Sequence, residues 1–214
     1  MLEWYRIGID DTKLMNDVER LLTRLLPTRA ISHFTYAELF ESHFYLNPHA
    51  VDVDKLNQLV GMHTNYKADV SGALECDQAL DILMTEVVEP NLTRGIVFIR
   101  EYPASHAALA KLAETEIEGK GYPIARRFEV YVDGIELANG YWELTDMQEQ
   151  KLRFEKDNLT RLKRGLQEVE IDRLLLEQVG ENMPDCAGVA LGVDRLLMLI
   201  MEADSLSEVM LFDD

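Results

Sequence analysis

Three glutamates stand inside one stretch of sequence that otherwise has the pattern of two strands joined by a turn. The stretch is FEVYVDGIELANGYWELTD, and the acids are Glu129, Glu136 and Glu143. Carboxylates are costly to place in a largely buried sheet unless a proton, a cation or a hydrogen-bond donor compensates them. They are therefore the first candidates for chemistry.

The turn of this hairpin predicts how two of the acids lie. Asp133-Gly134 is a favoured two-residue turn, so we expect Tyr131 to pair with Glu136. Because side chains alternate along a strand, Glu129 should share a face with Glu136 at a diagonal position, about 7 Å away between β-carbons. Such a pair suits Mg²⁺ brought with the phosphates of a nucleotide. An exposed face whose acids pair with lysines explains the hairpin alone equally well.

Glu143 does not follow the same alternation. It lies seven residues after Glu136 and would point to the opposite face of a straight strand. The two can share a pocket only if a turn or bulge falls between them. Asn139-Gly140 is a strong turn signal, so we expect the irregularity at Gly140.

A second candidate site follows near the end of the chain, in GVALGVDRLLMLIMEA. Gly188, Ala190 and Gly192 alternate as small residues, which predicts one strand face on which a flat ligand could lie against backbone. Arg195, in the first turn of the apolar helix that follows, could reach a phosphate or stack on a ring. Close packing of a helix on a sheet, with Arg195 at the surface, is the competing interpretation.

Composition limits the classes of function. The chain has 214 residues, 47% of them hydrophobic, which suffices for one large domain or a domain with a small insert. With 21 basic and 39 acidic residues its formal charge is −18, which disfavours a broad nucleic-acid footprint and fits ATP held with a metal ion, or a basic protein partner. Because we find no long apolar run and no signal peptide at MLEWYRIGID, we predict a cytoplasmic protein with no membrane segment. Cys76 and Cys186 lack the spacing of a zinc site or disulfide framework.

The elements that must position these residues alternate between strands and helices. An amphipathic helix is expected from Asp10 to Leu26, after a strand in MLEWYR, and a mostly helical insert over residues 35–91. Strand character returns at GIVFIREYP, RRFEVYVDGIELANG and AGVALGVD, with a charged helix ending at Gly165 before the last of them. This order predicts an α+β domain in which helices flank an antiparallel sheet.

The segments RRFEVYVDGIELANGYWELTD, MPDCAGVALGVDRLLML and MLEWYR resemble motif 3, the strands before it and the second strand of motif 2 in class II aminoacyl-tRNA synthetases of the lysine type. Within that family they look closest to the branch that lysylates elongation factor P. The resemblance covers essentially the whole chain. It implies that residues 1–214 are the C-terminal two-thirds of the enzyme, a partial catalytic domain. Motif 1, which forms the homodimer of the full-length family members, and the first strand of motif 2 with its α-phosphate arginine would precede Met1.

The resemblance also implies roles for individual residues. Glu129 and Glu136 would hold Mg²⁺, and Arg195 would be the catalytic contact to the γ-phosphate. ATP would be bound by Glu136, Leu137, Gly192 and Arg195. The lysine substrate would be bound by Glu3, Tyr5, Asn139, Tyr141 and Glu143.

The implied reaction is the ATP-dependent activation of lysine or β-lysine as an adenylate, followed by transfer to a lysine of elongation factor P. Two alternatives stay open. One is an ordinary lysine-tRNA ligase, which the acidic composition disfavours. The other is a non-catalytic module that binds a nucleotide, an amino acid or a protein partner, since the expected motif 2 arginine is not among these residues.

Overall fold

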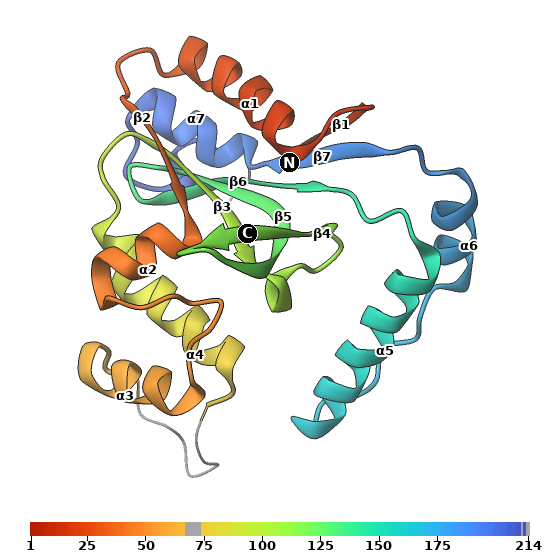
Figure 1. Ribbon diagram of the computed structural model, residues 1–214. Coiled ribbons are helices and arrows are strands. Elements are labelled where there is room, and N and C mark those ends of the chain that lie inside the picture. The colour runs from red at the N-terminus through yellow and green to blue at the C-terminus, as the bar shows by residue number, and fades with distance from the viewer. Residues whose placement is uncertain (67–73, 211, 213–214) are drawn as a thin grey trace.

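The structure is a computed structural model that describes residues 1–66, 74–210 and 212 (Figure 1). Within those residues seven strands form one sheet in the order β1-β7-β6-β5-β3-β2, with β4 paired to β5. Neighbouring strands are antiparallel except for the parallel pair β2 and β3. The predicted α+β class with a mainly antiparallel sheet is confirmed. The strands are β1 (Leu2–Ile7), β2 (Ile31–Thr35), β3 (Ile96–Pro103), β4 (Leu112–Ile117), β5 (Lys120–Val132), β6 (Ile135–Trp142) and β7 (Cys186–Leu191).

Helices flank this sheet. The α-helices are α1 (Asp11–Leu25), α2 (Tyr36–Phe44), α3 (Val53–His63), α4 (Cys76–Leu83), α5 (Met147–Lys163), α6 (Arg173–Asn182) and α7 (Val193–Met201). A π-helical turn covers Met84–Val88, and 3-10 turns cover Glu89–Asn91, Ala104–His106 and Leu206–Glu208. None of the helices in the described ranges is long and apolar enough to cross a membrane.

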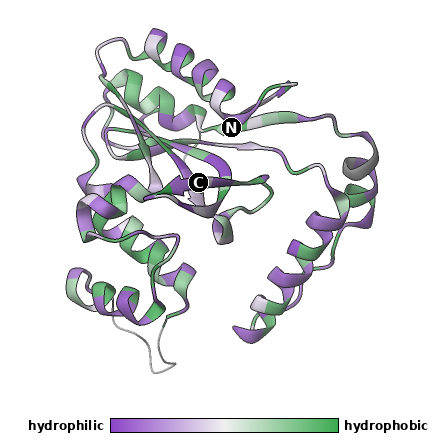
Figure 2. Ribbon diagram, in the orientation of Figure 1, coloured by the Kyte–Doolittle hydropathy of each residue, from purple (hydrophilic) through white to green (hydrophobic). Residues whose placement is uncertain are grey.

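One face of the sheet is covered by α1 and α7, which lie together above it in Figure 1. The α1 helix forms because its apolar residues recur every three or four positions and Asp10 caps its first turn, accepting a hydrogen bond from the Lys13 amide at 3.0 Å. Its buried side chains, among them Leu14 and Leu22, meet sheet residues such as Phe128 in one hydrophobic cluster. The largely hydrophobic colour of α7 in Figure 2 reflects the same burial. Each fully buried leucine contributes about 1.5–3 kcal/mol.

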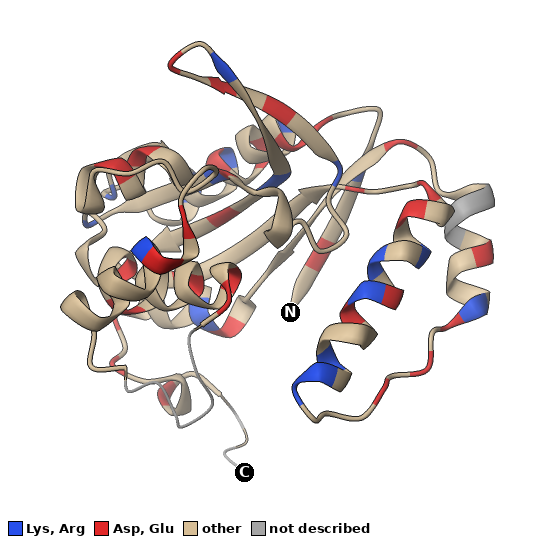
Figure 3. Cartoon of the chain, turned by 60° about the horizontal axis from the view of Figure 1, so that its bottom comes forward, with Lys and Arg blue, Asp and Glu red and all other residues tan. Residues whose placement is uncertain are grey.

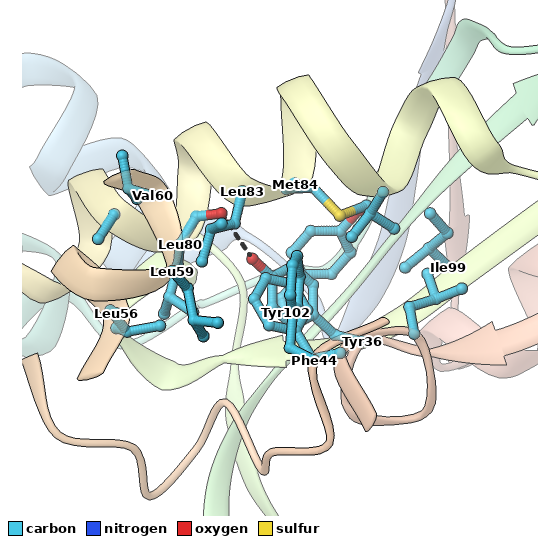
Figure 4. Packing of buried hydrophobic residues seen from close by; sticks show 14 of the residues in the cluster. Tyr36, Phe44, Leu56, Leu59, Val60, Leu80, Leu83, Met84, Ile99 and Tyr102 are labelled. Carbon is cyan, nitrogen blue, oxygen red and sulfur yellow. Dashed lines mark hydrogen bonds between the residues drawn. The ribbon is translucent and has the colours of Figure 1, made fainter. Parts of the chain in front are cut away.

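The opposite face is covered by α2, α3 and α4, but only at the β3 side of the sheet. Tyr36, Leu80 and Leu83 pack there on Ile99 and Tyr102 (Figure 4). A capping box at the start of α2 fixes the chain where it leaves β2. The helices predicted between residues 35 and 91 are present, and residues 67–73 of that range lie outside the described residues. That this range forms an insert stays a prediction.

The α5 and α6 helices lie to one side of the sheet as an antiparallel pair (Figure 1). Arg153 ties α5 to the body by donating to the carbonyls of Ala108 and Ala110 at 2.8 and 2.7 Å. Asn158 fixes the returning segment by exchanging two hydrogen bonds with the Val169 backbone. Lysine and arginine side chains recur along α5, in a chain that is acidic elsewhere (Figure 3).

The predicted hairpin is present, but its irregularity is not at Gly140. Tyr131 pairs with Glu136 as expected, and Val130 then pairs with Ala138. Leu137 is therefore an extra residue, a β-bulge. Leu137 and Ala138 both lie in the core under α1 and α7, and alternation resumes one residue out of step.

The prediction of a turn or bulge at Gly140 was wrong because glycine there serves close packing. β6 runs through Asn139 and Gly140 without a break. A β-carbon at Gly140 would overlap the ring of Phe128, which fills the space that the missing side chain leaves. A turn signal read from two residues was overridden by this tertiary contact.

Candidate functional site

Two rows of residues cross four neighbouring strands on the sheet face that carries Glu129. The strand register aligns one row as Glu3, Ala190, Asn139 and Glu129, and the next row as Tyr5, Gly188, Tyr141 and Arg127. The helices α2, α3 and α4 pack at the β3 side of this face, and Figure 3 shows the strands between those helices and α5. All five residues predicted to bind lysine except Glu143 belong to these two rows.

Glu143 follows the end of β6 and reaches the same face. A β-carbon at Gly188 would lie 2.5 Å from the Glu143 Oε1 atom and 2.5 Å from Tyr5 Cε1, so both side chains press on this glycine. The bulge at Leu137 supplies the change of parity that Glu143 needed. Close approach of Tyr5 and Glu143 is therefore built on a position that has room only for glycine.

Burial sets the chemistry of Glu143. Desolvation raises the pKa of its carboxyl from 4.5 to about 7. The pKa of Tyr5 is also raised, first by burial and then by the charge of Glu143. A cation placed between them would stabilise the ionised carboxylate and offset the desolvation. The arrangement therefore favours an ammonium group over a neutral one.

The glycine pattern is divided between two elements. Gly188 and Ala190 lie on β7 as predicted, whereas Gly192 lies after the strand and is the N-cap residue of α7. The space above Gly188 is taken by Tyr5 and Glu143. The expectation of one strand face of three small residues, open to a flat ligand, was therefore wrong.

All four residues predicted to bind ATP line one cavity of about 330 Å³. Arg195 donates from Nη1 to the Glu136 carbonyl at 2.6 Å and lies 3.8 Å from the Glu136 carboxylate. The Leu137 side chain is buried in the core under α1 and α7, so only its backbone can face a ligand. The lining residues are Met1, Glu136, Leu137, Ala138, Asn139, Ala190, Gly192, Asp194, Arg195 and Leu206.

A second cavity, of about 490 Å³, lies beside the first and shares Glu136 with it. Glu129 also lines it and is held by several donors. Its carboxylate accepts from the Tyr102 and Tyr131 hydroxyls at 2.7 and 2.9 Å, and from Arg127 Nη2 at 2.5 Å. Glu129 is thus fixed in place by residues of β3 and β5.

Glu136 is the less compensated acid of the pair. Its pKa is raised by burial and next by the charge of Glu129, and the Arg195 charge opposes this only in part. Two hard oxygen donors short of positive charge fit Mg²⁺. Within the described ranges no group of three or more histidine, cysteine or acidic side chains is arranged to hold a metal by itself. The donor set therefore fits a cation that brings further ligands, as a nucleotide's phosphates do.

Sequence reasoning missed Arg127, which belongs to the second row and contacts Glu129. Alternation could have found it, because Arg127 lies two residues before Glu129 and must share its face. The hydroxyl of Tyr102 was not predictable in this way. It reaches Glu129 only because β3 pairs with β5 across a bulge.

This fold and this site define a class. The chain belongs to the class II tRNA synthetases, in the group described as D, K and N, whose family model matches residues 1–214. The mainly antiparallel sheet with flanking helices is the architecture that this membership predicts.

The relatives narrow the likeness further. The chain is 42% identical over 217 residues to elongation factor P–(R)-β-lysine ligase of Salmonella gallinarum, and 41% identical to the proteins of that name from Salmonella paratyphi B and Salmonella heidelberg. Each match covers 99% of this chain and 64% of the relative, so the chain spans 64% of the length of the relatives it matches. The resemblance drawn from the sequence is confirmed.

Proposed function

We propose that this chain forms the larger part of an ATP-dependent ligase that activates lysine or β-lysine as an adenylate and transfers it to a lysine of elongation factor P. The observation that carries the proposal is the position of Glu143, a carboxyl with a raised pKa, beside a cavity lined by Glu136 and Arg195. One side of the site seeks an ammonium and the other a nucleotide with its cation. The names of the relatives supply the acceptor protein.

The nucleotide side is proposed to hold ATP between the β6 backbone and α7. Gly192 lies 3.5 Å, measured from a hypothetical β-carbon, from the Arg195 side chain, so the start of α7 stays open for a ring or phosphate. The Arg195 side chain is 47% exposed and can turn from Glu136 to a γ-phosphate, where its planar fork suits phosphate oxygens. Mg²⁺, when bound by Glu129 and Glu136, would neutralise charge on the phosphates.

The amino-acid side is proposed to take lysine with its side-chain ammonium at Glu143 and Tyr5. Tyr141 neighbours Gly188 in the row and would pack along the aliphatic stem. Glu3 and Asn139 flank Ala190 and would contact the amino group at the other end. A neutral side chain would leave the Glu143 charge unpaired, which is how the site would select lysine.

The proposed reaction has two steps. A carboxylate oxygen of the amino acid attacks the α-phosphorus of ATP, and the bond to the β-phosphate oxygen breaks to release pyrophosphate. The amine of the acceptor lysine then attacks the acyl carbon of the adenylate, and AMP leaves. The residues of the site act by position and charge, and no side chain forms a covalent bond. As expectations for the whole protein, we add a cytoplasmic location and a homodimer.

The test is lysine-dependent exchange between ATP and pyrophosphate, measured on this chain and on Glu136→Ala. Glu41→Ala, which removes an exposed carboxyl of α2, is the matched control. We expect exchange in the unaltered chain and in Glu41→Ala and its loss in Glu136→Ala. Absence of exchange in the unaltered chain, or exchange that survives Glu136→Ala, would contradict the proposed activation step.

The acceptor is tested separately, by presenting radiolabelled lysine and ATP with elongation factor P or with tRNA. We expect label on the protein and none on tRNA. The formal charge of −18 is the reason, because tRNA binding depends on lysine and arginine contacts to phosphates. Charging of tRNA alone would favour a lysine-tRNA ligase.

A further inference from the structure

Arg127 lies at the junction of the two halves of the proposed site. Its Nη2 atom pairs with Glu129 Oε1 at 2.5 Å, and its Nη1 atom donates to the His106 carbonyl at 2.9 Å. Its guanidinium carbon lies 4.6 Å from the ring centre of Tyr102 and 5.4 Å from that of Tyr141. The side chain is 13% exposed. Four groups from different elements therefore fix one planar cation.

This environment requires arginine specifically. A guanidinium can serve two acceptors with separate nitrogens while its flat face packs against aromatic rings. A lysine ammonium could reach Glu129 but could not also span the His106 carbonyl and stack on Tyr102. The Arg127 Nε atom is buried and has no hydrogen-bond partner among the described residues, so one donor is not committed to the resting arrangement.

The contacts of Arg127 divide between the two substrates. Glu129 belongs to the carboxylate pair of the nucleotide side, and Tyr141 belongs to the row that faces the amino acid. We propose that Arg127 is a positioning residue that couples binding of the metal-nucleotide to binding of lysine. This inference rests on the proposed function and adds to it an energetic link between the two substrates.

The coupling follows from ordering. A ligand that engages Glu129 restricts the guanidinium from one side, and a lysine stem that packs on Tyr141 restricts it from the other. The second ligand then meets a site that is already ordered and binds more tightly. Linkage requires the effect to be reciprocal, so each ligand strengthens the other by the same factor.

The experiment measures lysine affinity by titration calorimetry, with and without a non-hydrolysable ATP analogue and Mg²⁺, for the unaltered chain and for Arg127→Lys. We expect the nucleotide to tighten lysine binding by about fivefold or more in the unaltered chain. In Arg127→Lys this factor should fall to about one, although both ligands still bind. A residue that only supports the fold would change the affinities and leave their ratio unaltered.

Arg126 offers a matched control. It is the adjacent arginine on the opposite sheet face, where it donates from Nε to Asp11 Oδ1 at 3.0 Å and lies 5.0 Å from the centre of the Trp142 ring. Arg126→Lys thus breaks a similar combination of ion pair and stacking outside the site. We expect it to lower the melting temperature and to leave the coupling factor unchanged.

A second pair of variants protects the test against a folding defect in Arg127→Lys. Tyr141→Phe keeps the ring against Arg127 and should keep the coupling, whereas Tyr141→Leu removes the ring and should abolish it. Coupling that persists in both Arg127→Lys and Tyr141→Leu would overturn the inference and leave the proposed function standing. Absence of lysine binding to the unaltered chain would overturn both.

Discussion

The pKa of Glu143 makes lysine binding depend on pH in a way that can be calculated. Burial raises that pKa from 4.5 to about 7. If only the ionised carboxylate accepts the ammonium, about a tenth of the sites are competent at pH 6 and about nine-tenths at pH 8. The lysine side chain, with a pKa of about 10.4, stays charged throughout. We therefore expect the dissociation constant for lysine to fall about tenfold between pH 6 and pH 8.

The assay is titration calorimetry of lysine at half-unit steps from pH 5.5 to pH 8. The slope should approach tenfold per pH unit below pH 6 and flatten above pH 7.5. Glu143→Gln is the matched variant, because it keeps the size of the side chain and removes its titration. It should bind lysine weakly and with no such slope. An affinity that does not change across this range, or the same slope in Glu143→Gln, would refute the reasoning.

The same carboxyl makes a statement about stability, with a definite sign. Its pKa is higher in the folded than in the unfolded chain, so the folded state holds the proton more tightly between pH 4.5 and about pH 7. The free energy of unfolding should therefore decrease as pH rises through that window, by at most roughly 3 kcal/mol for this group. Urea unfolding at pH 5 and pH 7.5, compared between the unaltered chain and Glu143→Gln, isolates the contribution. Equal pH dependence in both chains would contradict it.

Two further substitutions test the packing on which the site depends. Gly188→Ala introduces a β-carbon 2.5 Å from Glu143 and Tyr5, and we expect calorimetry to show loss of lysine binding and denaturant unfolding to show a loss of about 1–3 kcal/mol in stability; unchanged lysine affinity would contradict the geometry. Asp11→Ala leaves Arg126 without its buried partner, and because that pair lies outside the site we expect urea unfolding to show about 3–5 kcal/mol less stability with unchanged lysine affinity; a near-neutral effect on stability would count against the ion pair.

The elements that sequence predicts best are those with a strong period. α1 repeats its apolar residues at helical spacing behind a capping acid, and the pairing of Tyr131 with Glu136 follows from the turn between them. β4 was missed because its sequence, LAETEI, alternates with glutamates and threonine on an exposed face. β2 was missed because it is short and runs directly into α2. Local pattern is weak where strand pairing alone decides the structure.

The candidate site divides in the same way. Residues on one strand, such as Glu129, could be assigned to a face by counting. Contacts between strands far apart in the chain could not, because nothing local encodes the approach of Tyr5 to Glu143 across Gly188. The predicted break at Gly140 failed for a related reason, since the Phe128 ring that requires this glycine comes from the neighbouring strand. Register, which settles all three questions, is a property of the assembled sheet.

The extra residue at Leu137 has a consequence for how this hairpin can vary. Every side chain after it takes its face from the number of residues that separate it from Glu136. Deleting one residue between Glu136 and Tyr141 would turn Asn139 and Tyr141 toward α1 and present Ala138 and Gly140 in their places. Loss or gain of two residues would preserve the faces. Substitutions can tune this segment freely, whereas its length can change only in even steps.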